Sequence, residues 1–231
     1  MIAAEANRLL LERGWLSLMP AEFSAAILAA CKWKRFPQRA TVYIAGDPPG
    51  GIYGVAQGAM AMTSALGNAN SPIANLAQAG SWTGLGPLLS GMPRRATMVA
   101  MQPLFVAYVP LPALQTMLTA RPEWWRHFAQ ELLIEFDMVC SVANDLLLRS
   151  AESRFAATLL RAANCRFQNP RENQPITVPM SQDALAEMTN LSRSSVSPIL
   201  ASFVQRGLIC TVYREIQILD VEGLRQIAEA D

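Results

Sequence analysis

Arginine and serine side chains that could contact DNA lie close together in residues 181–197. An arginine can donate two parallel hydrogen bonds to a guanine edge in the major groove, and hydroxyl groups can bond to bases or to phosphate oxygens. We expect Arg193 to read a guanine, with Ser194 and Ser197 contacting neighbouring bases. The supporting contacts, mainly to phosphates, are expected from Ser181, Gln182, Ser192, Ser195 and Arg214.

Two short helices joined by a tight turn are predicted to position these side chains. Ser181 and Ser192 each stand where a helix would be capped by a serine hydroxyl. Asn190 tolerates the left-handed backbone conformation that a sharp corner between helices requires. Apolar residues in the second helix are spaced four and three apart, so they form one buried stripe: Val196, Leu200 and Phe203.

Residues 209–219 follow as two short runs rich in β-branched residues, broken at Arg214 and Glu215. Such a pair of strands after two helices has the shape of a wing. Asp220 then stands at the N-cap of a last helix. The stretch therefore predicts a winged helix-turn-helix, although a small helical domain that binds nothing is the alternative.

Pro198 interrupts the pattern of the second helix. A proline inside a helix removes one backbone hydrogen bond and clashes with the carbonyl four residues earlier, here that of Ser194, at a cost of about 3 kcal/mol. We expect the helix either to kink there or to begin late, at Ser197 and Pro198. Both outcomes would change how Arg193 is aimed.

The charge balance is unfavourable for DNA binding. The 231-residue chain has a formal net charge of +1, and its residues 151–231 contain 8 arginines and 9 acidic residues. Non-specific affinity depends on neutralising phosphates, so a near-neutral domain must gather its few arginines on one face. We expect Arg193, Arg206 and Arg214 to share that face and two copies of the chain to act together.

Catalytic and metal-binding patterns are missing from the sequence. His127 is the sole histidine, so no triad of the serine or cysteine hydrolase type can be assembled. The cysteines are scattered without a short pairing at Cys31, Cys140, Cys165 and Cys210. We expect neither an enzyme nor a bound metal or other cofactor.

The apolar residues are dispersed along the chain. No run approaches the roughly 18 uncharged apolar residues that a membrane span needs. The N-terminus carries acid early and lacks the features of a secretory signal. We expect a soluble protein that contacts no membrane and has a cytoplasmic location.

The first half of the chain reads as a β structure preceded by two short helices, at residues 3–13 and 20–30. From residue 33 to about residue 110, short strand-like runs alternate with closely spaced glycine and proline turns, which is typical of an antiparallel barrel or jelly roll.

A long helix follows at about residues 122–149. Its apolar residues repeat with heptad spacing, which predicts pairing with a second copy; packing on the chain's own barrel is the alternative. The seam consists of Trp125, Ala129, Leu132, Phe136, Val139, Ala143 and Leu146.

Three strings in this order resemble the Crp/Fnr family of bacterial transcription regulators over about residues 15–230. They are residues 46–53 (GDPPGGIY), 82–97 (WTGLGPLLSGMPRRAT) and 191–197 (LSRSSVS). The resemblance implies an α+β fold with a cyclic-nucleotide-binding-like jelly-roll barrel, a dimerisation helix and a winged helix-turn-helix. It divides the chain at residues 1–110, 111–150 and 151–231, and it implies double-stranded DNA, a second copy and RNA polymerase as partners.

The second string looks like the family's effector-binding cassette, which implies Gly84, Leu85, Arg94 and Arg95 as site residues. Arg94 matches the arginine that holds a cyclic phosphate, whereas Leu85 replaces the ribose-binding Glu and Arg95 replaces a Ser or Thr. A ribose hydroxyl against Leu85 would be unpaired, at a cost of about 1–3 kcal/mol. We therefore expect another small anion as effector, if the two arginines are not simply solvated.

A rival interpretation treats the chain as a small-molecule-binding or protein-interaction module whose DNA-reading surface has decayed. Pro198 and the acidic balance of residues 151–231 favour it. Salt dependence separates the two, because a true DNA binder loses affinity steeply as salt rises.

Overall fold

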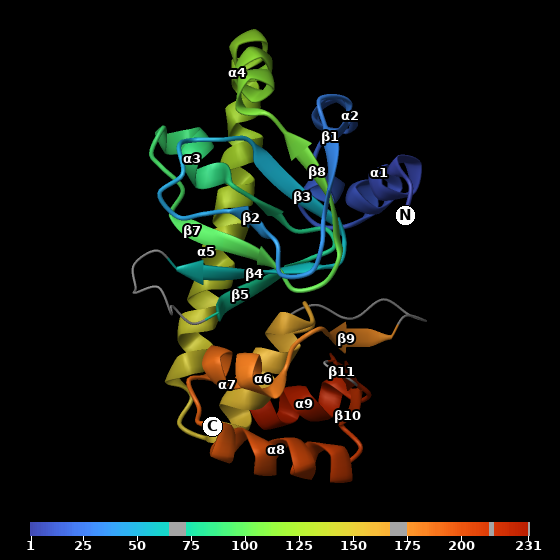
Figure 1. The fold of residues 1–231 in the computed structure, drawn as a ribbon, viewed down its shortest axis with the longest axis vertical. Coiled ribbons are helices and arrows are strands. Elements are labelled where there is room, and N and C mark those ends of the chain that lie inside the picture. The colour runs from blue at the N-terminus through green and yellow to red at the C-terminus, as the bar shows by residue number, and fades with distance from the viewer. Residues whose placement is uncertain (65–72, 167–174, 213–214, 231) are drawn as a thin grey trace. The chain divides into compact units, whose positions relative to one another are not determined.

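The computed structural model describes residues 1–64, 73–166, 175–212 and 215–230. They form two compact units, Met1–Asp137 and Met138–Asp231. Helix α5, Trp125–Leu147, begins in the first unit and ends in the second (Figure 1). The boundary between the units therefore lies inside this helix.

Unit 1 begins with helices, continues as strands and returns to helices, as the sequence predicts. Its helical segments are α1 (Ala3–Glu12), η1 (Trp15–Leu18), α2 (Ala21–Ala29), α3 (Leu85–Ser90), α4 (Leu111–Ala120), η2 (Pro122–Trp124) and the first part of α5. Its strands are β1 (Lys32–Phe36), β2 (Thr41–Tyr43), β3 (Ile52–Gln57), β4 (Ala59–Ser64), β5 (Ile73–Gln78), β6 (Trp82–Thr83), β7 (Ala96–Ala100) and β8 (Leu104–Val109).

Two antiparallel sheets make up the barrel of unit 1, with strand orders β1-β8-β3-β6 and β2-β7-β4-β5. Their inner faces meet in one buried cluster, to which Val55 and Val106 belong from the first sheet and Met60 and Met98 from the second. Burying both apolar faces against each other removes them from water, which is the main stabilising contribution to such a sandwich. The predicted jelly-roll barrel is confirmed.

An aromatic cluster joins the N-terminal helices to the start of α5. The ring of Trp15 lies 5.4 Å from Phe23, 5.6 Å from Trp82 and 5.3 Å from Phe128 between centroids. The indole N–H of Trp15 also donates to the carbonyl oxygen of His127 at 3.0 Å. Edge-on aromatic contacts of this kind add to the burial energy, so α5 is firmly anchored at its first turns.

Unit 2 contains the end of α5 and a small helical domain with a three-stranded sheet of order β10-β11-β9. Its elements are α6 (Ala151–Ala162), β9 (Ile176–Val178), α7 (Gln182–Thr189), α8 (Arg193–Gln205), β10 (Ile209–Val212), β11 (Glu215–Ile218) and α9 (Val221–Ala228). Phe155 of α6 and Phe203 of α8 are fully buried, with ring centroids 5.8 Å apart.

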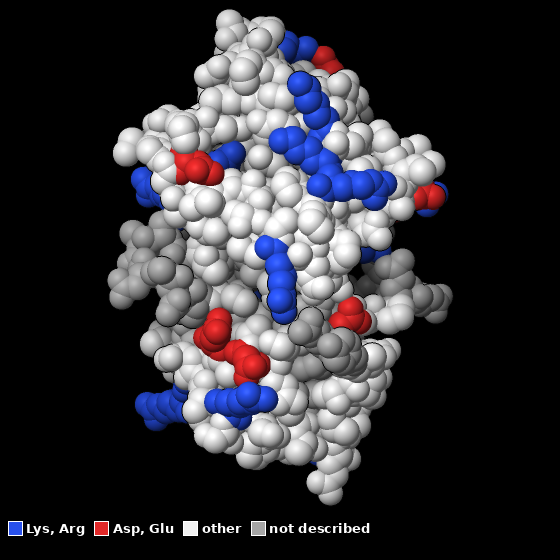
Figure 2. Space-filling view, in the orientation of Figure 1, with Lys and Arg blue, Asp and Glu red and all other residues white. Residues whose placement is uncertain are grey.

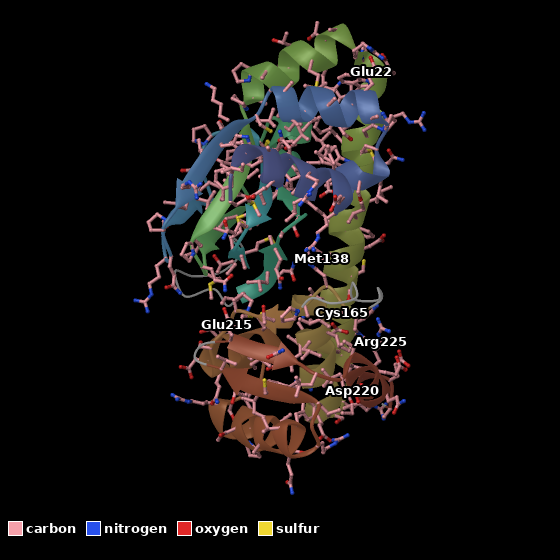
Figure 3. The ribbon with its side chains drawn as sticks, turned by 90° about the vertical axis from the view of Figure 1, so that its right-hand side faces the viewer. Glu22, Met138, Cys165, Glu215, Asp220 and Arg225 are labelled. Atoms are coloured by element: carbon pink, nitrogen blue, oxygen red, sulfur yellow. The ribbon has the colours of Figure 1, made fainter. Side chains whose placement is uncertain are left out.

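Two buried polar contacts tie the helices of unit 2 together. Asp145 of α5 accepts from Arg161 of α6 at 3.0 Å and from Arg166 at 3.3 Å. Arg225 of α9 donates to the carbonyl oxygen of Cys165 at 3.0 Å (Figure 3). Asp145 and Arg161 are almost completely buried, so each depends on the other for compensation of its charge.

The long helix differs slightly from the predicted range of 122–149. Its first residues form the 3-10 turn η2, and α5 ends at Leu147. Ser150 then caps α6 by accepting from the N–H of Ser153 at 3.2 Å. The break between α5 and α6 thus falls at residues 148–150, next to the predicted end of the long helix at residue 149.

The predicted seam of α5 is exposed along its whole length. Phe136 is 61% exposed and Val139 52% exposed, and the other five seam residues are exposed as well. The alternative, that the seam packs on the chain's own barrel, is therefore excluded for a single copy. Exposed apolar side chains at heptad spacing are typical of a helix that pairs with another chain.

Candidate functional site

The corner between α7 and α8 has the predicted capping. The hydroxyl of Ser181 accepts from the N–H of Ala184 at 3.2 Å at the start of α7. Asn190 adopts the left-handed conformation, with φ 51° and ψ 43°, at the end of α7. The N–H of Leu191 then donates to the carbonyl of Ala186 at 3.0 Å, which closes the turn.

Helix α8 begins at Arg193, capped by Ser192, whose hydroxyl accepts from the N–H of Ser195 at 3.2 Å. The stripe of Val196, Leu200 and Phe203 is buried. The candidate contacts all lie on the exposed side of the corner: Ser181, Gln182, Ser192, Arg193, Ser194, Ser195 and Ser197. The Ser192 hydroxyl is also 2.8 Å from those of Ser194 and Ser195, so these three hydroxyls form one small cluster.

The expectation that α8 begins late is wrong. The helix runs without interruption from Arg193 to Gln205, with Pro198 inside it. Pro198 is exposed, as is Ser194, whose carbonyl loses its partner in the helix, so water can bond to that oxygen. The Ser192 cap before Pro198 and the buried stripe on either side of it hold the helical conformation despite the missing bond.

Two of the three arginines that were expected to share the DNA-binding face are already paired with acidic residues. Arg193 lies with Nε 3.3 Å from Oδ1 of Asp183 on α7, and Arg206 donates to Glu152 of α6 at 2.9 Å. Basic and acidic side chains stand side by side on the face of unit 2 that Figure 2 shows. Few of the described arginines are thus free to form the expected basic face, and the ion pair of Arg206 mainly links the end of α8 to Glu152 of α6.

The predicted wing is present in β10 and β11, which pair in antiparallel register from Ile209 opposite Ile218 to Val212 opposite Glu215. Strand β9 adds to the other side of β11. Arg214, the predicted phosphate contact of the wing, lies outside the described residues. Asp220 caps α9 as predicted, accepting from the N–H of Gly223 at 2.8 Å.

In unit 1, the two neighbouring arginines of the cassette lie in different environments. Arg94 is 5% exposed, and its guanidinium donates to the carbonyl of Gly51 at 2.6 Å and lies 4.3 Å from the ring centroid of Tyr43. Arg95 is exposed. Arg94 is therefore built into the barrel, whereas Arg95 is a surface residue.

Gly84 and Leu85 begin the short helix α3. Gly84 has φ +97°, and a Cβ atom there would lie 2.4 Å from Nη1 of Arg94, so only glycine allows this approach. Leu85 is fully buried in the apolar cluster around Trp15 and Ile52. Its side chain is therefore part of the hydrophobic core of unit 1.

Several polar residues of unit 1 were not predicted as site residues. Tyr43 of β2 and Thr83 of β6 share a hydrogen bond of 2.7 Å, and burial raises the pKa of Tyr43 to about 12. Glu131 of α5 is 4% exposed and Glu135 is half-buried. In the sequence, two acids one turn apart read as a solvated face; only their spacing from Trp124 and Phe128 signals that they face inward.

Among the described residues, no three His, Cys, Asp or Glu side chains gather in a group that could hold a metal ion. None of the helices in this part of the chain is long and apolar enough to cross a membrane. The candidate sites are thus the α7–α8 corner with its wing and the polar interior of the barrel.

Comparison with known proteins identifies the two domains that contain these candidate sites. Residues 33–121 match the profile of the cyclic nucleotide-binding domain, and residues 153–227 match that of the Crp-like helix-turn-helix domain. The transcriptional regulator LdrP of Thermus thermophilus is 27% identical over 195 residues, which is 84% of this chain and 96% of LdrP. The transcriptional regulatory protein btr of Bordetella pertussis is 24% identical over 191 residues, covering 81% of this chain and 77% of btr.

Solved structures of the same architecture include TTHB099, a CRP-family transcriptional regulator from Thermus thermophilus. It has a TM-score of 0.66 and 27% identity, over 84% of this chain and 96% of TTHB099. FixK2 from Bradyrhizobium japonicum has a TM-score of 0.74 over 87% of this chain and 98% of its own, at 19% identity, and so shows the fold alone.

A barrel of this kind followed by a winged helix-turn-helix defines a ligand-sensing transcription regulator that binds DNA. The chain belongs to the Crp/Fnr family.

Proposed function

We propose that the chain is a homodimeric regulator in which Arg193 reads a guanine in each half-site. The observation that carries this proposal is the position of Arg193 at the exposed first residue of an uninterrupted, capped α8. Helix N-terminal residues of this kind enter the major groove in winged and other helix-turn-helix proteins. Ser194 and Ser197 would contact neighbouring bases, and Ser181, Gln182, Ser192, Ser195 and Arg214 would contact mainly phosphates.

Selection of DNA sequences from a random pool tests this assignment. Arg193→Ala should relax the preference at one base pair per half-site, because a bidentate arginine is worth about 1–3 kcal/mol of discrimination, and should keep salt-dependent binding. Arg206→Ala is the matched control on the same helix, because its guanidinium is paired with Glu152. An Arg193→Ala protein that selects an unaltered motif would contradict the proposal.

The decayed-surface alternative is favoured by one observation, the pairing of Arg193 with Asp183. Binding to mixed-sequence DNA over a range of salt concentrations separates the two functions. A regulator should bind at low salt and weaken steeply as salt rises, whereas a decayed surface should show no binding even at low salt. We assign the chain no catalytic role, because its relatives are regulators.

For the barrel, we propose an effector other than cyclic AMP. Leu85 offers no acceptor to a ribose hydroxyl, and Arg94 already donates to Gly51 and faces Tyr43. Cyclic AMP at about millimolar concentration should therefore leave the melting temperature almost unchanged, because weak binding stabilises little. A shift that saturates at micromolar concentration would contradict this. Arg95 is exposed and could meet a small anion at the surface, with RNA polymerase as a further partner of the regulator.

A further inference from the structure

The face of α5 that packs against the barrel changes character along its length. Trp124 and Phe128 are buried in the aromatic cluster of unit 1. The next two positions at helical spacing, Glu131 and Glu135, carry carboxyl groups. Residues three and four apart share one face of a helix, so the acidic pair continues the inward face.

Glu131 is buried without a compensating charge. Its side chain is 4% exposed, and its Oε2 atom has no hydrogen-bond partner among the described residues. Burial raises the pKa of Glu131 to about 9, with a further contribution from Glu135, and burial raises the pKa of Glu135 to about 7. A carboxyl buried in this way is stabilised by a cation or by strong N–H donors.

The groups around this pair belong to the barrel. Tyr43 of β2 interacts electrostatically with Glu135 and also with Arg94, whose guanidinium stacks on its ring. Tyr53 of β3 lies 5.7 Å from Tyr43 between ring centroids. Glu135 thus lies near the ring of Tyr43, and the guanidinium of Arg94 on that ring is held by its own bond to Gly51.

A second buried polar atom of unit 1 is also unpartnered, in the aromatic cluster around Trp15. The indole N–H of Trp82 on β6 has no acceptor among the described residues, although the side chain is only 3% exposed. Trp82 packs on Trp15, which packs on Phe128, one turn before Glu131 on α5. The indole N–H therefore lies in the cluster that Phe128 joins, on the face of β6 opposite to Thr83 and Tyr43, and it costs free energy until it is paired.

We propose that Glu131 and Glu135 form an acidic binding site in the barrel, which takes the planar amidinium or guanidinium group of a small aromatic or aliphatic ligand. This proposal deepens the proposed effector-sensing function of unit 1 and rests on it. A planar cation of this kind pairs with a carboxylate through two parallel N–H···O bonds and can lie on an aromatic ring. An anion does not fit this subsite, because it gains no charge pairing from a protonated carboxyl and is repelled by an ionised one.

Benzamidine is the probe for this site, with benzamide as a neutral isostere and benzoate as an anion of similar shape. Thermal shift and calorimetry on the full-length protein should show saturable binding of benzamidine and none of the other two. Glu131→Gln should weaken benzamidine binding at least about tenfold, and Glu135→Gln should weaken it less. Asp137→Asn is the matched control, an exposed acid on the same helix that should leave the affinity unchanged.

Binding should also tighten as the pH rises from about 6 to about 9, because the cation requires an ionised carboxyl and displaces its proton. Burial raises the pKa values of Tyr43, which interacts with Glu135, and of Tyr53 beside it, so neither tyrosine loses its proton over that range.

Equal affinity for benzamidine and benzamide, or unchanged binding by Glu131→Gln, would overturn the proposal. The comparison of the three probes uses the unaltered protein and so does not depend on the folding of any variant. DNA binding is measured separately, so loss of DNA binding with intact benzamidine binding would contradict the proposed regulator and leave the acidic site standing.

Discussion

Arg193 at the start of α8 lies with its Nε atom 3.3 Å from Oδ1 of Asp183 on α7, and both side chains are exposed, at 74% and 63%. An ion pair this exposed is worth at most about 1 kcal/mol, so DNA can compete with Asp183 for the guanidinium. The carboxylate nevertheless stands beside the residue that we expect to enter the groove, where phosphate charge is dense. The Asp183 carboxylate therefore weakens DNA binding but does not prevent it.

Asp183→Asn should therefore tighten binding to mixed-sequence DNA several-fold at low salt, with a smaller gain at high salt because screening weakens the repulsion. Titration of labelled DNA at two salt concentrations measures this. Glu187→Gln, which removes an exposed acid from the same helix, should have a smaller effect. Weaker binding by Asp183→Asn would mean that the carboxylate orients Arg193 for contact.

The helix-turn-helix was predictable because its determinants are local. The capping serines Ser181 and Ser192, the left-handed Asn190 and the apolar stripe each act within one turn of the backbone, and the structure contains all of them. Pro198 was misjudged because its cost was weighed alone. A cost of about 3 kcal/mol is comparable to the burial of one or two large apolar side chains, and α8 buries three.

The inward acids were not predictable in the same way. Glu131 and Glu135 depend on how α5 meets a barrel made from strands that are far away in the sequence. Arg94 shows the same limit, because its buried position follows from Gly51 and Tyr43, which precede it by about 40 residues or more. Charged residues are assigned to the solvent by default, so only the packed structure reveals which of them are buried.

Pro198→Ala should stabilise unit 2. Pro198 lies inside a continuous helix, and alanine at this position would restore the hydrogen bond to the carbonyl of Ser194. The expected net gain is about 2 kcal/mol, because the unfolded chain is more flexible with alanine than with proline and this offsets part of the gain in the helix. Thermal or urea unfolding measures it, with Ser197→Ala as the exposed neighbour control. No gain in stability would show that the helix is locally distorted around the proline.

Charged residues in the seam of α5 should produce monomers. Phe136→Glu with Val139→Glu places like charges where two exposed apolar rows would meet, which disfavours pairing. Light scattering reports the mass, and DNA affinity should fall with it because one near-neutral unit 2 makes few phosphate contacts. Leu18→Glu, an exposed leucine outside α5, is the control and should remain dimeric. An unchanged dimer mass in the seam variant would place the interface elsewhere.

Asp145→Ala should destabilise unit 2 by roughly 3–5 kcal/mol, because it removes the carboxylate that neutralises the buried Arg161. Glu22→Ala is the contrasting variant. Its partner Arg121 is half-exposed and also pairs with Glu123, so the loss of Glu22 should cost much less stability than the loss of Asp145. Chemical unfolding measures the loss of stability in each variant. Equal losses for Asp145→Ala and Glu22→Ala would contradict the argument that burial makes the Asp145–Arg161 pair more important.

The raised pKa of Glu131 predicts how stability depends on pH. Between the ordinary carboxyl pKa and about 9, the folded state holds a proton on Glu131 that the unfolded state has lost, so its contribution is greatest at acidic pH and declines as the pH rises. Glu131→Gln keeps the neutral form at every pH and should gain on the order of a few kcal/mol over the parent protein at about pH 9, with little difference at about pH 4. Unfolding free energies across this range, with Asp137→Asn as control, measure the gain. A difference between Glu131→Gln and the parent that does not change with pH would show that Glu131 is ionised in the fold.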